Sequence, residues 1–208
     1  MLVVYPGVRA GASWAPWMLR LVDLVVLAAP LVLAALVAWR VAANPEGRAG
    51  GIRRWAPVDI VLGVCVGGVV RAIVELVQPT TGTLEGPLTA GPAPGRIAAA
   101  VVLVAGVAAV SPVVEEVFFR GVLQQALTDH LGGLGRVAAA STAIVVSTAA
   151  FVALHVLPGG AVVPVGLVVG SAGVGVGAGI LLAVTGRLSG AIVTHVVFNG
   201  SGILLLMV

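Results

Sequence analysis

The sequence has little charge and no lysine. Only 9% of its 208 residues are charged, whereas 60% are hydrophobic, and the mean hydropathy is +1.17. This composition excludes an ordinary soluble globular domain. The net charge of +3 comes from 11 arginines against 8 acids, too few to form a basic stripe, so a nucleic-acid partner is excluded. Cys65 is the only cysteine, which excludes an intrachain disulfide.

Long apolar runs dominate what is present. A helix needs ~20 apolar residues to cross a bilayer, and an open sheet edge has no hydrogen-bond partners in lipid. We therefore predict an all-α, polytopic membrane helical bundle of about six to seven segments, with membrane lipids as partners. The expected spans are 17–39, 57–77, 96–127, 136–156, 161–184 and 188–207.

One of these runs is too long for a single straight span. At ~1.5 Å per residue the helix 96–127 would be ~48 Å long, against a hydrocarbon core of ~30 Å. Because proline lacks an N–H and clashes with the preceding turn, Pro112 is predicted to kink this helix or split it in two.

The chain is predicted to divide into an N-terminal part, 1–95, with two transmembrane helices and a loop, and a core, 96–208. In the first part, Arg71 and Glu75 are four residues apart and are expected to pair on one helix face. The linker 40–55 has four arginines and one glutamate. This excess predicts a cytoplasmic linker under the positive-inside rule.

Two acids and an arginine lie together in the apolar run 114–121, whose sequence is VEEVFFRG. Glu116 precedes Arg120 by four residues, a spacing that favours an ion pair. Glu115 points ~100° away around the helix, so it has no assigned partner. A spare carboxylate in a water-poor pocket suits a general base that acts on water. The alternative is a pair of surface acids at a helix start, favoured by the helix dipole.

Two histidines follow in later apolar segments. His155 comes four residues after Phe151, and His195 precedes Asn199 by four, so each pair shares a helix face. Ionisable groups within a bilayer are costly, which makes each a candidate site residue. With the acids they offer either metal ligands or donors to a developing oxyanion. The alternative for each histidine is an ordinary packing role.

Three patterns therefore occur in order: Glu-Glu-x-x-x-Arg, Phe-x-x-x-His and His-x-x-x-Asn. In this order, each in an apolar segment, they resemble the CAAX prenyl protease and bacteriocin-processing (CPBP, or Abi) family of intramembrane proteases. The resemblance covers about residues 96–205.

The resemblance implies an intramembrane endopeptidase similar to type II CAAX prenyl endopeptidases. It assigns water activation to Glu115, support of its helix to Glu116 and Arg120, water placement to His155, and oxyanion stabilisation to His195 with Asn199. The family has been described both as metal-dependent and as metal-free. No cofactor is therefore assigned, and a divalent metal such as zinc, held by Glu115, His155 and His195, stays open.

The resemblance also implies a peptide or protein substrate, and leaves open whether its C-terminus is prenylated. The expected location is a bacterial plasma membrane. If Pro112 lies near a membrane face, Glu115 and His155 meet at the face of the linker 40–55, so the site should open to the cytoplasm. If 96–127 is one straight span, Glu115 and His155 should fall at different depths.

A non-enzymatic membrane protein is the alternative function. Asp23, Asp59, Arg71 and Glu75 lie in the first two apolar segments, where charges could form the relay of a proton- or metal-coupled transporter. A membrane scaffold is a further form of this alternative. No inverted repeat with broken helices is evident, which argues against a transporter.

Overall fold

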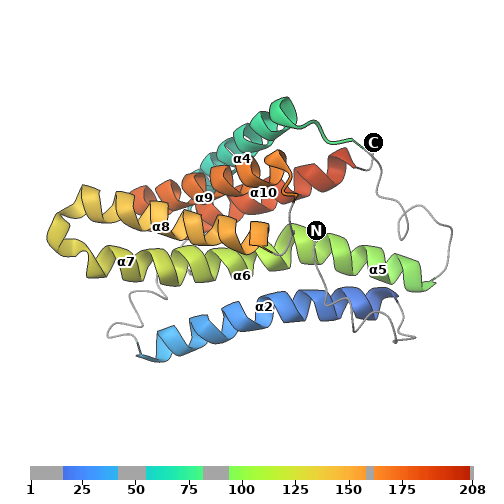
Figure 1. Ribbon diagram of the computed structural model, residues 1–208, viewed down its shortest axis with the longest axis horizontal. Coiled ribbons are helices and arrows are strands. Elements are labelled where there is room, and N and C mark those ends of the chain that lie inside the picture. The colour runs from blue at the N-terminus through green and yellow to red at the C-terminus, as the bar shows by residue number, and fades with distance from the viewer. Residues whose placement is uncertain (1–15, 42–54, 82–93, 158–161, 207–208) are drawn as a thin grey trace.

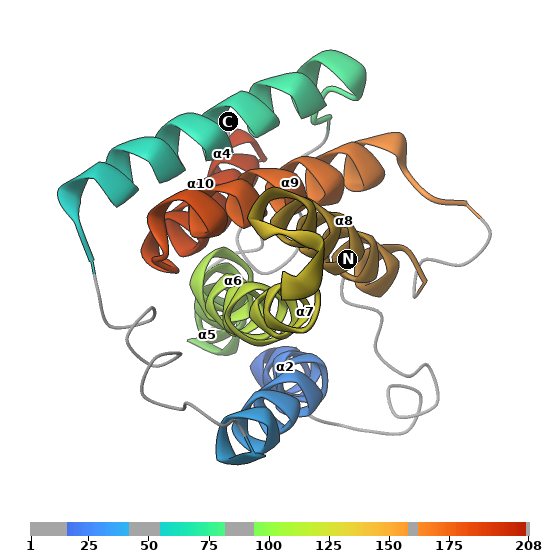
Figure 2. The same cartoon turned by 90° about the vertical axis from the view of Figure 1, so that its left-hand side faces the viewer.

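The structure, a computed structural model, describes residues 16–41, 55–81, 94–157 and 162–206, which form helices and connecting turns without a strand (Figure 1). One continuous helical rod runs through the middle of the chain. The other helices pack around it (Figures 1 and 2). The rod comprises, in order, α5 (Pro94–Ala105), η1 (Gly106–Val110), α6 (Ser111–Phe118), η2 (Phe119–Gln124) and α7 (Gln125–His130). The remaining elements are α2 (Pro16–Val41), α4 (Pro57–Val77), η3 (Gly132–Leu134), α8 (Arg136–Val156), α9 (Val165–Thr185) and α10 (Ser189–Leu205).

Within the described residues, five helices are long and apolar enough to cross a membrane, and α10 is a shorter apolar helix. Large apolar side chains such as Leu33, Val37 and Val61 are exposed on the outside of the bundle. An exposed apolar surface of this extent suits contact with lipid. The predicted all-α membrane bundle is therefore confirmed.

Of the two outcomes predicted at Pro112, a kink or a split, the split is wrong, and the kink stays a prediction. The rod passes through Ser111 and Pro112 without a break, so 97–130 forms a single candidate span. The turn directly before them, η1, is π-helical. In a π-helical turn the N–H of residue i+5 bonds the carbonyl oxygen of residue i. This wider spacing makes room for the ring of Pro112, which has no N–H to donate. The helix therefore continues where an α-helical register would have been interrupted.

The rod is covered on two sides. Figure 2 shows α2 below it and α8, α9 and α10 above it, with α4 lying across α9 and α10. α8 runs back along the rod from the turn at η3 (Figure 1). The rod thus faces two helices, α8 and α10, that approach it from far apart in the sequence.

α4 is held tightly on α10 by two glycines. A Cβ on Gly63 would lie 2.6 Å from the Cβ of Val193, and one on Gly67 would lie 2.6 Å from the carbonyl oxygen of Thr194. Both positions therefore require the absence of a side chain, as expected for close helix packing in membranes. Gly68 takes no part, because a Cβ there would meet nothing within 4 Å.

An ion pair fastens the start of α4 to the turn before α10. Asp59 is fully buried, and Arg187 donates to its Oδ1 from Nη2 at 2.6 Å and to its Oδ2 from Nε at 2.8 Å. Ser189 donates to the same carboxylate. The hydrogen bonds with Asp59 raise the pKa of Arg187 above its usual value. The division at residue 95 stays a prediction, and α4 packs directly on the helices that follow it.

Candidate active site

The middle of the rod carries three buried ionisable residues. Glu115 is 4% exposed, and Glu116 and Arg120 are fully buried. Oε1 of Glu116 lies 3.1 Å from Nη1 of Arg120, so the ion pair expected from their spacing is present. Glu115 takes no part in this pair, and its Oε1 accepts a hydrogen bond from the hydroxyl of Ser111.

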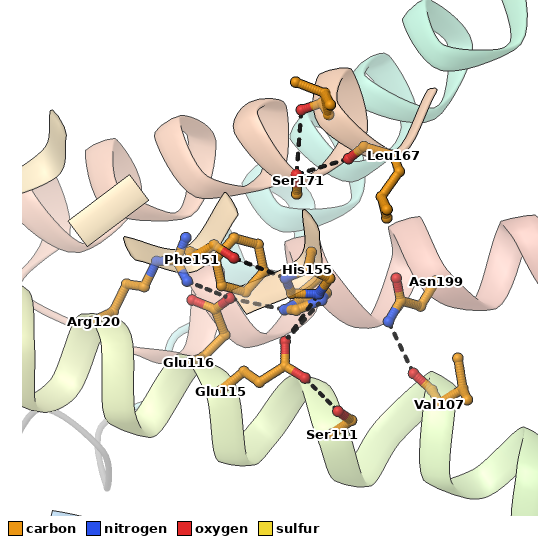
Figure 3. Close-up of polar contacts among 12 residues, drawn as sticks. Val107, Ser111, Glu115, Glu116, Arg120, Phe151, His155, Leu167, Ser171 and Asn199 are labelled. Atoms are coloured by element: carbon orange, nitrogen blue, oxygen red, sulfur yellow. Dashed lines mark hydrogen bonds and ion pairs between the residues drawn. The ribbon is translucent and has the colours of Figure 1, made fainter. Parts of the chain in front are cut away.

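His195 of α10 also reaches Glu116. Its Nδ1 lies 2.9 Å from Oε1 of Glu116, the oxygen that binds Arg120 (Figure 3). Sequence reasoning missed this contact because it joins residues 79 positions apart, and no local pattern reports such a distance. Glu116 therefore fixes both the arginine of its own helix and the imidazole of another.

Glu115 faces the other edges of both imidazoles. Its Oε2 lies 3.7 Å from Nε2 of His155 and 3.8 Å from Nε2 of His195. These distances exceed those of a hydrogen bond, and Oε2 of Glu115 is buried without a hydrogen-bond partner. Figure 3 shows the Glu115 carboxylate pointing towards His155. A buried acceptor beside two ring nitrogens is therefore left unsatisfied.

The partner of Nδ1 sets the tautomer of His155. This nitrogen lies 2.9 Å from the carbonyl oxygen of Phe151. A carbonyl oxygen only accepts, so Nδ1 of His155 carries the proton, and in the neutral ring Nε2 is an acceptor. His155 is 27% exposed at its side chain, whereas the His195 side chain is 3% exposed. His155, at the C-terminal end of α8, is therefore the more exposed of the two imidazoles.

The ring of Phe151 forms the wall behind the cluster. Its centroid lies 4.4 Å from that of His155 and 5.4 Å from that of His195. The guanidinium of Arg120 lies 4.6 Å from the same ring. Because Phe151 is 1% exposed, it keeps water from the Glu116–Arg120 pair and limits how far both imidazoles can turn.

Asn199 lies one turn beyond His195 and faces the same rod. Its Nδ2 donates to the carbonyl oxygen of Val107 at 2.9 Å. Val107 belongs to the π-helical turn η1, where the altered bonding leaves carbonyl groups available to side chains. The structure thus places Asn199 beside the group formed by the other five candidate residues (Figure 3).

The antiparallel packing of α8 on the rod brings Glu115 and His155 together. Glu115 precedes the turn at η3 by roughly as many residues as His155 follows it, so both lie at a similar height. Although 97–130 is one continuous helix with π-helical turns at η1 and η2, the two residues are therefore neighbours. His155 was also expected at the face of the linker 40–55, of which 42–54 lie outside the described residues. α4, which follows the linker, begins at the Asp59–Arg187 pair, whereas His155 ends α8 shortly before the start of α9, where Gly166 bonds Gln78 at the far end of α4, so this expectation is wrong.

The same three side chains were expected to offer a metal site. Imidazole and carboxylate donors suit zinc, but no group of three such residues within the described part of the chain has the arrangement to hold a metal ion. The separations of 3.7 and 3.8 Å exceed the ~3.4 Å expected between ligands ~2.1 Å from a tetrahedral zinc. The donor types therefore suit zinc, and the two separations are a few tenths of an ångström wider than the ideal tetrahedral value.

Comparison with known proteins gives one family-level result. A family model described as type II CAAX prenyl endopeptidase, Rce1-like, matches residues 97–201, which is about half of the chain. This range contains all six candidate residues. No curated protein and no solved structure matches the chain.

Proposed function

Because the chain belongs to the Rce1-like type II CAAX prenyl endopeptidase family, we propose that it is an intramembrane endopeptidase in which Glu115 activates the attacking water. Family membership implies a protease with a peptide or protein substrate, which disfavours the transporter and scaffold alternatives. The observation that carries the finer proposal is the buried, unbonded Oε2 of Glu115, aimed at Nε2 of two histidines.

The attacking water would bind beside Oε2 of Glu115 and Nε2 of His155. Polar atoms separated by more than about 3.5 Å are commonly bridged by a water. Such a water would donate one hydrogen to Oε2 of Glu115 and the other to Nε2 of His155, which its tautomer leaves as an acceptor. Its lone pair would then point away from both. Glu115 would take the proton as the water oxygen attacks the peptide carbonyl, and would pass it to the leaving amine.

His195 would stabilise the oxyanion formed in that attack. Its Nδ1 is engaged by Glu116, so donation from Nε2 requires the imidazolium form. The positive charge of that form would balance a cluster that otherwise holds two carboxylates, Glu115 and Glu116, and one guanidinium, Arg120. Asn199 has a second N–H besides the one that binds Val107, and this N–H would assist His195.

We keep the metal question separate from these steps. If zinc were bound, Glu115, His155 and His195 would have to move closer together to hold it, and the metal would polarise the water. Turnover in the presence of a chelator tests this. Unchanged turnover supports the metal-free steps, and loss that zinc restores would replace them.

The experiment that tests the function is peptide cleavage by the purified protein in liposomes. Glu115→Gln should lower turnover by about 100- to 10,000-fold and His155→Ala should also reduce it strongly, because both groups contact the proposed water. Wild-type turnover in Glu115→Gln would refute the proposal. Pairing each peptide with its prenylated form tests the substrate class: faster cleavage of the prenylated form supports C-terminal processing, and equal rates count against it.

We also propose a bacterial plasma membrane as the location, with the His155 end facing the cytoplasm. The arginines do not favour this orientation, since Arg40, Arg136 and Arg187 lie towards the opposite end, where the chain enters and leaves the arginine-rich linker 40–55, and only Arg20 and Arg96 lie towards the His155 end. A prenylated substrate would be anchored at the cytoplasmic leaflet, which favours this orientation. Labelling of Leu157→Cys in a Cys65→Ser background with an impermeant maleimide tests it: labelling only from the outside would reverse the orientation.

A further inference from the structure

Arg71 of α4 contacts the helix that carries two of the proposed site residues. Its Nη2 donates to the carbonyl oxygen of Phe198 at 2.8 Å, and its guanidinium carbon lies 4.1 Å from the centroid of the Phe198 ring. Phe198 lies on α10 between His195 and Asn199. Arg71 also lies outside the family match, which begins at residue 97. The contact therefore joins the N-terminal part of the chain to the proposed oxyanion donors.

The guanidinium is itself held in place from the other side. Nη1 of Arg71 lies 3.2 Å from Oε1 of Glu75. Thr80, just beyond the end of α4, donates its backbone N–H to Oε2 of Glu75 at 2.7 Å and its hydroxyl to Oε1 at 2.6 Å. Each oxygen of Glu75 is thus occupied, and the carboxylate holds Arg71 at a fixed point. A chain of polar contacts runs from Thr80 through Glu75 and Arg71 to the backbone of α10.

Two glycines, one on α10 and one on α9, leave room for the contact between Arg71 and Phe198. A Cβ on Gly202, one turn beyond Phe198, would overlap Nη2 of Arg71. A Cβ on Gly170 of α9 would lie 2.6 Å from Cζ of Phe198. The first glycine makes room for the guanidinium and the second for the ring on which it lies. Three helices therefore meet at Phe198 with their side chains fixed.

We propose that Arg71 is a positioning residue, which holds the turn of α10 that presents His195 and Asn199 to the oxyanion. This inference rests on the proposed peptidase function. Arg71 touches neither Glu115 nor His155 through any hydrogen bond of the described residues, so it acts through the backbone of Phe198. Displacing a catalytic group by about 1 Å costs about 100-fold in rate. Loss of Arg71 should accordingly lower kcat and leave KM unchanged.

The test measures kcat, KM and the melting temperature of four variants. Wild type and Glu115→Gln are measured beside them as references. Arg71→Ala removes the contact, and Arg71→Lys keeps the charge but lacks the fork that spans Glu75 and Phe198. Gly202→Ala displaces the guanidinium without changing it. Gly200→Ala is the matched control on the same helix, because a Cβ there meets nothing within 4 Å.

We expect kcat to fall by about 10- to 100-fold in Arg71→Ala and Gly202→Ala, less in Arg71→Lys, and not in Gly200→Ala, with KM constant throughout. If Arg71→Ala does not fold, Gly202→Ala and Arg71→Lys still decide the question. The positioning role would be overturned if the folded variants keep the wild-type kcat, even if their melting temperature is lower. In that case a low kcat in Glu115→Gln would still support the peptidase function. Wild-type turnover no faster than that of Glu115→Gln would refute the peptidase function and this inference with it.

Discussion

Glu115 and Glu116 are adjacent, yet replacing each by glutamine should have opposite consequences. Glutamine keeps the size of the side chain and one carbonyl oxygen while removing the charge. Glu116 is the partner of Arg120 at 3.1 Å, with both side chains fully buried. Oε2 of Glu115 lies 3.7 and 3.8 Å from Nε2 of His155 and His195, beyond hydrogen-bond distance, and has no hydrogen-bond partner. The two substitutions therefore separate a structural charge from a catalytic one.

The magnitudes follow from the partners. Glu116→Gln leaves Arg120 buried, with Nε and Nη2 already without hydrogen-bond partners, and breaking a buried pair in this way costs about 3–5 kcal/mol. That is a large part of a typical total stability of about 5–15 kcal/mol. For a chain of this size it lowers the melting temperature by about 6–20 °C.

Glu115→Gln breaks no hydrogen-bonded ion pair, and the glutamine carbonyl oxygen can still accept from Ser111, so its melting temperature should stay close to that of wild type. Its kcat should fall by about 100- to 10,000-fold, the usual contribution of a general base. This corresponds to about 3–5 kcal/mol of transition-state stabilisation.

The assay is a thermal melt in detergent beside peptide turnover in liposomes. Equal destabilisation by the two substitutions, with turnover retained in Glu115→Gln, would show that both acids are structural. Turnover lost in Glu115→Gln at unchanged stability is the expected result.

Three further predictions concern residues around the site and the packing. Ser111→Ala should lower kcat about 10-fold, the scale of one lost hydrogen bond to a charge, because the Glu115 carboxylate is then no longer held. Ser111→Thr should restore kcat, and an unchanged kcat in Ser111→Ala would show that Ser111 has no role at the site. Asp59→Ala should lower the melting temperature, because Arg187 and Ser189 both lose the buried carboxylate that they bind. Thermal melting measures this, with Arg187→Ala as the companion variant; an unchanged melting temperature would contradict it. Gly175→Ala should lower the melting temperature because the new Cβ would lie 2.6 Å from Cγ2 of Thr148 on α8. Gly68→Ala should not, since a Cβ there meets nothing within 4 Å. Equal melting temperatures of the two variants would contradict this packing.

The sequence by itself determined the membrane helices and the ion pairs that lie within one helix. Apolar length sets the spans because the bilayer has a fixed thickness, and a spacing of four residues sets the Glu116–Arg120 and Arg71–Glu75 pairs because it returns a side chain to the same face. The three motifs also identified the family. Each of these is a property of neighbouring residues, and so could be predicted without a fold.

Only the tertiary structure decided how the segments meet. The passage of the rod through Pro112 depends on a π-helical turn that no residue pattern announced. The height of His155 depends on how α8 packs against the rod, and the contacts His195–Glu116 and Arg71–Phe198 join residues 79 and 127 positions apart. Such contacts depend on side chains from separate helices packing in three dimensions, where spacing along one chain carries no information.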